Sequence, residues 1–298
     1  MRRALVAALA VLVLGAAGAP SPAPPFGAAS GCSVIGYRRD DRLLRVPVQV
    51  NGTPLWFDID TGARHSVIDR ATAKRLKLQI LRTDQMGGAG HGTQTMLHAA
   101  PLTIAIGGIQ QRIVDPWVID LGHTGTNNHL DGLIGIEFFK AYVVRIDPIA
   151  QTVAFCDPAA FKNELSGATI PLVAEDDRLF IQVTLTLPNG ITATHRVRVD
   201  TGSDDAVSDN LVRQSSIRQK SLQGVGIGTP YVDYSGVFAS VRIGPYRIEH
   251  VWGPSGDPPA VGMEILQRFI LTFDVPHARL TLQPTLQLND PVPSPAPN

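Results

Sequence analysis

The stretch that decides the fold is Val46-Pro47-Val48-Gln49-Val50-Asn51-Gly52-Thr53-Pro54-Leu55-Trp56-Phe57-Asp58-Ile59-Asp60-Thr61-Gly62. It contains two strand-like runs joined by Asn51-Gly52, and Asn-Gly between alternating apolar runs is the strongest short-range hairpin signal. The same plan returns later, with a turn at Asn189-Gly190 and a second strand that ends in Asp200-Thr201-Gly202. The sequence therefore predicts a duplicated β-rich unit.

The two halves also share the elements that come after each Asp-Thr-Gly. An apolar-apolar-Gly element stands at Leu133-Ile134-Gly135 and again at Ala260-Val261-Gly262, and a closing strand pair begins near Arg145 and near Thr272. One Asp-Thr-Gly arises easily by chance, whereas two in the same context do not. The structural alternative is a duplicated β-domain whose Asp side chains only satisfy their own turns.

Length and composition favour two lobes of moderate size. The 298 residues exceed a typical single core, and the 44% hydrophobic content is too high for a disordered chain. Arg2 and Arg3, followed by a short apolar run and small residues, predict a signal peptide rather than a retained anchor. The expected organisation is signal peptide 1–19, Pro/Ala-rich linker 20–32, N-terminal lobe 33–157, inter-lobe connection 158–169, C-terminal lobe 170–286 and disordered tail 287–298. Short helices are expected at 69–76, 136–141, 208–214 and 263–269.

Charge and histidine spacing exclude several classes of function. Lys+Arg and Asp+Glu both number 26, so the net charge gives no steering toward nucleic acid or an anionic membrane. No phosphate-binding loop and no Gly-x-Ser-x-Gly hydrolase motif occurs. The histidines lack the spacing of a zinc helix motif, so we expect no metal and no cofactor; those weighed are His91, His98, His123 and His129.

Two aspartates from separate lobes can do chemistry together. Amide hydrolysis needs an activated water, a proton acceptor and a proton donor. Two carboxyls within hydrogen-bond distance share one proton, so one can accept while the other donates. Asp60 and Asp200 are therefore the expected catalytic pair, in a cleft between the lobes. Thr61 and Thr201 can reach backbone across the interface, and Gly62 and Gly202 allow close approach.

Asp60-Thr61-Gly62-Ala63 and Asp200-Thr201-Gly202-Ser203, with the two apolar-apolar-Gly elements, resemble the bacterial retropepsin-like branch of the aspartyl proteases, in which two carboxyls are known to share one proton. The resemblance covers roughly residues 46–282. It implies an all-β fold of two pseudo-symmetric pepsin/retropepsin-like β-barrel lobes with short helices. It also implies an aspartic endopeptidase that acts on peptide or protein substrates. The Gly-rich loops would be substrate-covering flaps, or else simply flexible hairpin tips: Gly87, Gly88, Gly90, Gly224, Gly226 and Gly228.

Arg64 and Asp204 depart from the pepsin-type pattern, in which Ser or Thr follows the motif's fourth residue. If they face the dyad, a cation near Asp60 would lower the pKa of the pair and an anion near Asp200 would raise it. Arg64 in particular keeps open a second interpretation, an exported peptide-binding protein with little or no catalytic activity. Both carboxyls lie in one chain, so a monomer suffices.

The two cysteines leave three alternatives open. In an oxidising compartment Cys32 and Cys156 can form a disulfide, and otherwise both stay as thiols. Cys32 in Ala29-Ser30-Gly31-Cys32 also loosely resembles a bacterial lipid-attachment site, although the Pro/Ala stretch before it argues against this. We expect export to the bacterial periplasm or secretion, with no transmembrane anchor once the signal is removed.

Overall fold

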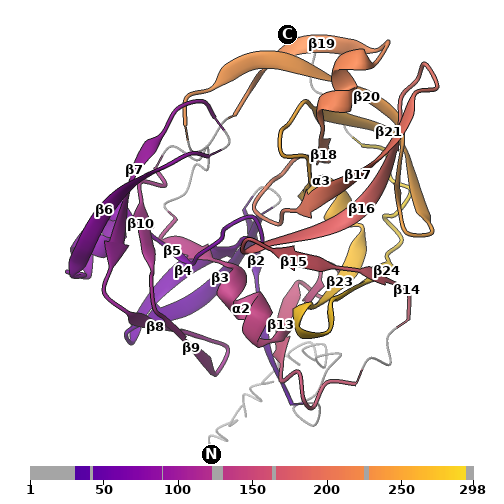
Figure 1. Cartoon of the computed structure of the whole chain (residues 1–298). Helices are drawn as coiled ribbons and strands as arrows, with labels where there is room; N and C mark the ends of the chain where they lie inside the picture. The colour runs from indigo at the N-terminus through magenta and orange to yellow at the C-terminus, as the bar shows by residue number, and fades with distance from the viewer. Residues whose placement is uncertain are drawn as a thin grey trace, which may run out of the picture.

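The computed structural model describes residues 31–40, 43–88, 90–122, 130–162, 166–224 and 228–292. The predicted signal peptide 1–19, linker residues 20–30 and tail residues 293–298 lie outside this part of the chain, as do His123 and His129. The described residues are mostly β-strand with a few short helices (Figure 1), which confirms the all-β prediction. Within them, no helix has the length and apolar character needed to span a bilayer.

A ten-stranded sheet forms lobe one, the indigo to magenta part of Figure 1. Its central hairpin pairs β3 (Leu43–Val50) with β4 (Thr53–Ile59), as predicted. Asn51 and Gly52 both have positive φ, 48° and 84°, which is what a two-residue hairpin turn of the favoured twist requires. The remaining strands are β2 (Arg38–Asp40), β5 (Val67–Asp69), β6 (Ile80–Met86), β7 (Gln94–Ala99), β8 (Leu102–Ile106), β9 (Ile109–Ile113), β10 (Trp117–Ile119) and β11 (Gly132–Ile134).

An eight-stranded sheet forms lobe two and repeats this plan. Its central hairpin pairs β16 (Arg178–Thr186) with β17 (Thr192–Val199) around the turn that contains Gly190. The other strands are β15 (Val173–Glu175), β18 (Val207–Ser208), β19 (Arg218–Gln223), β20 (Tyr231–Ile243), β21 (Tyr246–Pro254) and β22 (Ala260–Val261).

Neither sheet closes into the barrel that the resemblance implied. In lobe one the strand order runs from β6 to β9, and among the described residues these two edge strands do not pair with each other. Each edge is a hairpin, β6–β7 at one end and β8–β9 at the other. The β6–β7 hairpin reaches toward lobe two rather than back onto its own sheet (Figure 1). The lobes are therefore open, twisted sheets.

A six-stranded sheet joins the two lobes. Its order is β1-β13-β12-β23-β24-β14, in which β12 (Val143–Asp147) of lobe one pairs antiparallel with β23 (Phe269–Asp274) of lobe two. Each half contributes three strands in mirrored order, so the pseudo-twofold relation passes between β12 and β23. The other four are β1 (Cys32–Gly36), β13 (Thr152–Cys156), β14 (Ala168–Pro171) and β24 (Arg279–Pro284). Strand β14 thus begins inside the predicted inter-lobe connection 158–169.

The four predicted helical segments all contain helix. Asp69, the first residue of the first predicted segment, is its N-cap: the carboxylate accepts hydrogen bonds from the N–H groups of Ala71 and Thr72. Asp209 caps the corresponding segment of lobe two by accepting from Leu211 N–H. The helices are α1 (Arg70–Arg75), α2 (Ile136–Ala141), the 3-10 turn η2 (Asn210–Gln214) and α3 (Met263–Leu266); a further 3-10 turn, η3 (Val275–His277), was not predicted.

One continuous hydrophobic core runs through both lobes and the shared sheet. Phe139 of α2 meets Phe273 of β23 edge-to-face, with ring centroids 5.2 Å apart. Residues 287–292 of the predicted tail also join this structure. Leu288 packs against the core, and Arg268 donates hydrogen bonds to the carbonyl oxygens of Leu288 and Asp290. A buried guanidinium needs acceptors, and here the tail backbone supplies them, so the tail is ordered to this point.

Cys32 and Cys156 form a disulfide between β1 and β13. Both cysteines of the chain are therefore paired. Of the three alternatives, the structure has the disulfide, which occupies the sulfur that lipid attachment at Cys32 would need. The bond fastens the first described strand to the end of lobe one.

Candidate active site

The two Asp-Thr-Gly turns begin where β4 and β17 end. Behind each, a short parallel strand fixes the backbone: β11 runs alongside β4, and β22 alongside β17. The Asp60 N–H donates to the carbonyl of Ile134 at 3.0 Å, and the Asp200 N–H donates to the carbonyl of Val261 at 2.9 Å. The apolar-apolar-Gly elements thus supply these supporting strands, and the direction of each aspartate is set by buried strands rather than by loops.

Thr61 and Thr201 interlock across the lobe interface. The Thr61 hydroxyl donates to the carbonyl of Val199 at 2.7 Å and accepts from the Thr201 N–H at 3.0 Å. In the reciprocal pair, the Thr201 hydroxyl donates to the carbonyl of Ile59 at 2.9 Å and accepts from the Thr61 N–H at 3.0 Å. Both threonines are fully buried. Four buried hydrogen bonds therefore lock the two turns together.

This interlock brings the two carboxyl groups together. A Cβ atom placed on Gly62 would lie 2.5 Å from Oδ1 of Asp200, and one placed on Gly202 would lie 2.4 Å from Oδ1 of Asp60. Each carboxyl thus lies against the glycine of the opposite turn, and any side chain at either glycine would collide with it. The structure places the predicted pair, and the four supporting Thr and Gly residues, in one cluster between the lobes.

The pKa of Asp60 is raised within this pair. Burial, and then the charge of Asp200, raise the pKa of Asp60 from 3.8 to about 7. The N–H groups of Gly62 and Ala63, which donate to Asp60 Oδ1 at 2.7 and 3.1 Å, oppose this rise. The charge of Arg198 opposes it as well. The pair therefore carries one shared proton until the pH approaches about 7.

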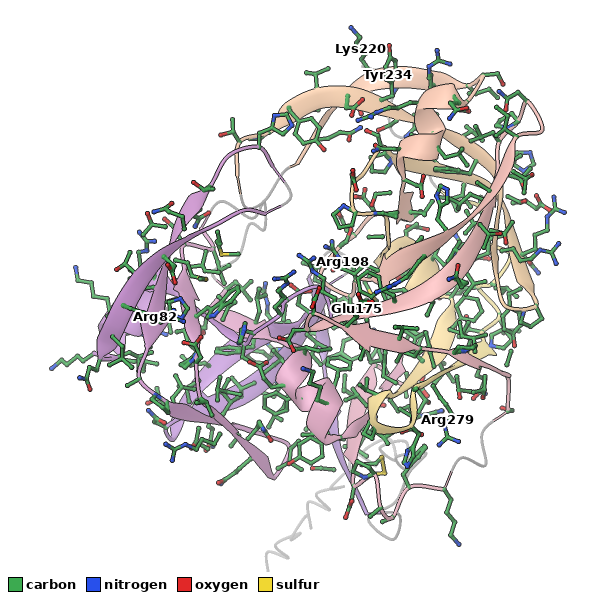
Figure 2. All side chains as sticks on the ribbon, viewed as in Figure 1. Arg82, Glu175, Arg198, Lys220, Tyr234 and Arg279 are labelled. Carbon is green, nitrogen blue, oxygen red and sulfur yellow. A yellow bond between two sulfur atoms is a disulfide. The ribbon has the colours of Figure 1, made fainter. Side chains whose placement is uncertain are left out.

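Arg198 was not predicted and is the cation that touches the dyad. Its Nη2 donates to Oδ2 of Asp200 at 2.6 Å, and the Arg198 side chain lies near the middle of the molecule where the lobes meet (Figure 2). Asp200 Oδ1 accepts only from the Gly202 N–H at 3.1 Å among the hydrogen bonds of its own turn. The signal was present in the sequence, because a residue two positions before Asp200 on a strand points to the same face.

The two departures that raised doubt, Arg64 and Asp204, do not touch the carboxyls. Asp204 is exposed, and so is its neighbour Asp205. Arg64 is partly buried and lies within electrostatic range of Asp177 and Arg178 of lobe two. The cation that acts on Asp60 is Arg198 instead. The condition under which Arg64 would lower the pKa of the pair, direct contact with the dyad, is therefore not met.

The two Gly-rich loops meet each other. His91 N–H donates to the Thr229 carbonyl at 2.9 Å, and Thr229 N–H donates to the His91 carbonyl at 2.8 Å. Gly90 and Gly228 pack backbone to backbone beside this bridge. The His91 ring stacks on Tyr231, with centroids 4.2 Å apart. Of the candidate flap glycines, Gly87, Gly88 and Gly90 lie at the β6–β7 tip and Gly224 and Gly228 at the β19–β20 tip, while Gly226 lies outside the described residues.

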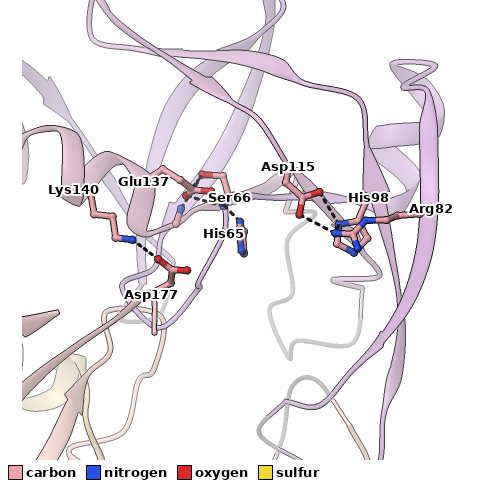
Figure 3. A network of polar contacts seen from close by, with 9 residues as sticks. His65, Ser66, Arg82, His98, Asp115, Glu137, Lys140 and Asp177 are labelled. Atoms are coloured by element: carbon pink, nitrogen blue, oxygen red, sulfur yellow. Dashed lines mark hydrogen bonds and ion pairs between the residues drawn. The ribbon is translucent and has the colours of Figure 1, made fainter. Parts of the chain in front are cut away.

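The remaining polar clusters in lobe one are structural (Figure 3). His98 is buried and bonds Asp115 at 2.7 Å, and His65 lies 3.6 Å from Glu137, which accepts hydrogen bonds from Ser66. Across the described part of the chain, no group of three or more His, Cys, Asp or Glu side chains is arranged to hold a metal ion.

Comparison with known families matches residues 46–138 to the family described as "Aspartyl protease". The matched segment contains the Asp60 turn, the β6–β7 hairpin and the supporting strand β11. It supports an aspartyl protease family for this chain. The comparison with curated proteins found no match.

Proposed function

We propose that this protein is an aspartic endopeptidase in which Asp60 and Asp200 activate one water molecule between them. The observation that carries the proposal is the reciprocal threonine interlock, which brings two carboxyls from separate turns against each other. A protein that only bound peptides would gain nothing from two carboxyls that each pack against the glycine of the opposite turn. The family match over residues 46–138 supports the same class of hydrolase.

The two carboxyls take different roles. The Arg198 guanidinium hydrogen-bonds to Asp200, and a cation at this distance favours the ionised carboxylate. Asp60 has its pKa raised to about 7 and keeps the shared proton. Asp200 is therefore the general base and Asp60 the general acid at the start of the cycle.

The first step adds water to the peptide carbonyl. Asp200 removes a proton from the water, whose oxygen attacks the carbonyl carbon, while Asp60 gives its proton to the carbonyl oxygen. The product is a neutral gem-diol, with Asp200 protonated and Asp60 ionised. In the second step Asp200 protonates the leaving nitrogen, one gem-diol hydroxyl returns its proton to Asp60, and the carbon–nitrogen bond breaks. Both carboxyls regain their starting states.

The joined loop tips at His91 and Thr229 would cover the substrate. A peptide in an extended conformation can pair with backbone of the hairpins in the manner of an added strand. Because the tips are hydrogen-bonded to each other, they would have to part for a chain to enter, and closing again would exclude water from the site.

The proposal includes export and a monomer. Residues 1–19 have the features of a signal peptide, and the Cys32–Cys156 disulfide suits an oxidising compartment such as the periplasm or the cell exterior. Both carboxyls come from one chain, so catalysis needs no second copy.

The test is peptide cleavage by the parent and by carboxyl variants. Purified protein is incubated with a mixed peptide library from pH 3 to 8, with Asp60→Ala and Asp200→Ala beside it. We expect the parent to cleave and each variant to lose at least about 10³-fold in rate. Asp204→Asn is the matched control, because Asp204 is exposed on the same turn as Asp200, and it should keep full activity. Cleavage that survives either alanine variant would remove the proposed mechanism.

The second candidate is a peptide-binding protein of the same fold, and the Arg198–Asp200 ion pair is the observation that favours it. A guanidinium on the catalytic carboxylate could hold it too firmly for proton transfer. Binding of library peptides without cleavage at any pH would establish this candidate instead.

A further inference from the structure

Three arginines converge on the side of the dyad that Asp200 occupies. Arg198 hydrogen-bonds to Asp200. In the β16–β17 ladder Phe180 pairs with Arg198, so Arg178, two residues earlier, lies opposite Asp200 and on the same face of the sheet. Arg64 comes from the other lobe, four residues after Asp60.

An ion pair between the lobes brings Arg64 and Arg178 together. Lys140 of α2 binds Asp177, which lies in the turn between β15 and β16 (Figure 3). This contact holds the turn of lobe two against lobe one, directly beside Arg178. Burial, and then the positive charges of Arg64 and Arg198, lower the pKa of Arg178, so both cations lie within electrostatic range of Arg178.

The nearby acids form no hydrogen bond to Arg64 or Arg178. Asp177 is bound by Lys140, Glu175 by Arg196 and Asp200 by Arg198. Asp176 is exposed at the tip of the turn. Among the described residues, no carboxylate or other acceptor forms a hydrogen bond to Arg64 or Arg178, and the Nε atoms of both are enclosed by protein without a partner. Arg64 and Arg178 thus have no hydrogen-bonded carboxylate among the described residues, although the charges of Asp176 and Asp200 act on Arg178 and that of Asp177 acts on Arg64.

We infer that Arg64 and Arg178 bind a carboxylate of the peptide substrate, next to the bond that is cut. This inference rests on the proposed function and names its substrate class. A guanidinium matches a carboxylate with two parallel hydrogen bonds, and partial burial strengthens the pairing. The carboxylate is that of an Asp or Glu side chain or of the peptide's C-terminus. Both supply the same chemistry, and the experiment separates them.

The experiment compares matched peptides on the intact protein. Each peptide found to be cleaved is remade with Asp or Glu at each position within three residues of the cut, beside the isosteric Asn or Gln version, and with a free or amidated C-terminus. We expect kcat/KM to be at least about tenfold higher for the acid at one position, and this ratio to fall as salt is raised. A preference confined to the free C-terminus would assign the carboxylate to the chain end.

Substitutions then locate the preference. Arg64→Gln and Arg178→Gln should each reduce the acid-to-amide ratio of kcat/KM to below about threefold. Arg178→Lys should keep an intermediate ratio because the positive charge remains. The control is Arg196→Gln, which removes an arginine of the same strand as Arg198 that is ion-paired with Glu175, and it should leave the ratio unchanged. An unchanged ratio in both Arg64 and Arg178 variants would overturn the inference.

Failure of this inference and of the proposed function can be told apart. Cleavage of acid and amide peptides at equal rates would refute the carboxylate site and leave the peptidase standing. For the opposite case, peptide binding is measured on Asp60→Asn protein, which cannot turn over. Tighter binding of acid peptides with no cleavage by the parent would support the carboxylate site and refute the peptidase.

Discussion

The two Asp-Thr-Gly turns have the same backbone and different charges. In both, a parallel strand supports the aspartate and a threonine enters the interlock. Two residues before Asp60 stands Asp58, whose buried carboxylate forms an ion pair with Arg45 of the same lobe. The distance from Arg45 Nε to Asp58 Oδ1 is 3.0 Å. Two residues before Asp200 stands Arg198, which binds Asp200 itself. The repeated backbone thus creates the pair, and one unrepeated residue makes its two members chemically unequal.

The largest expected effect concerns the threonine interlock, to which both turns contribute equally. Thr61→Val and Thr201→Val each remove two buried hydrogen bonds and leave a backbone N–H and a carbonyl unpaired, so each should lower the free energy of unfolding by about 3 kcal/mol. The two losses should agree within about 1 kcal/mol because the interlock is symmetric. Urea denaturation measures both. Thr→Ser at either position keeps the hydroxyl and should cost about 1 kcal/mol. Unequal losses would show that the turns are not equivalent in stability.

The next effect separates the two carboxyls by pH. The pKa of Asp60 is raised from 3.8 to about 7, so between these values the folded protein keeps a proton that the unfolded chain has lost. Stability should therefore decrease as pH rises from about 4 to 7 and level off above. Asp60→Asn should remove this slope. Asp200→Asn should only make it shallower, since burial still raises the pKa of Asp60. Urea midpoints at several pH values test this, and a parent whose stability rises through this window would contradict it.

The smallest expected effect concerns Arg198, which stands before Asp200 and has no counterpart before Asp60. The charge of Arg198 lowers the pKa of Asp60, so Arg198→Gln should raise it further. The alkaline limb of kcat/KM should then move to higher pH by roughly one unit. Arg196→Gln, two residues earlier on the same strand face, should leave the limb in place. If the alkaline limb of the kcat/KM profile is unchanged in the Arg198 variant, or moves to lower pH, Arg198 does not govern the protonation of the pair.

Local sequence signals predicted the parts of this molecule that depend on neighbours in the chain. Asn51-Gly52 indicated the first hairpin, Asp69 marked the start of a helix, and the paired Asp-Thr-Gly motifs located the carboxyls. These features arise from turn geometry, capping and strand alternation, which a few adjacent residues determine.

The features that could not be predicted depend on contacts between distant segments. Strand alternation places Arg198 on the same face as Asp200, but it does not tell that the guanidinium binds Asp200, because Asp58 at the matching place pairs with a neighbouring strand instead. The meeting of His91 with Thr229 joins hairpins from different lobes, and the pairing of β12 with β23 builds one sheet from two halves. Tertiary packing decides such choices.

The seam between β12 and β23 has the character of a subunit interface inside a single polypeptide. The two halves contact each other through the six-stranded sheet, the threonine interlock and the Lys140–Asp177 ion pair. None of these contacts involves the covalent link, residues 158–167. The disulfide lies wholly on one side of the seam. We therefore expect the architecture to survive without this peptide link, so that two separately made fragments, cut within it, reassemble into one folded protein.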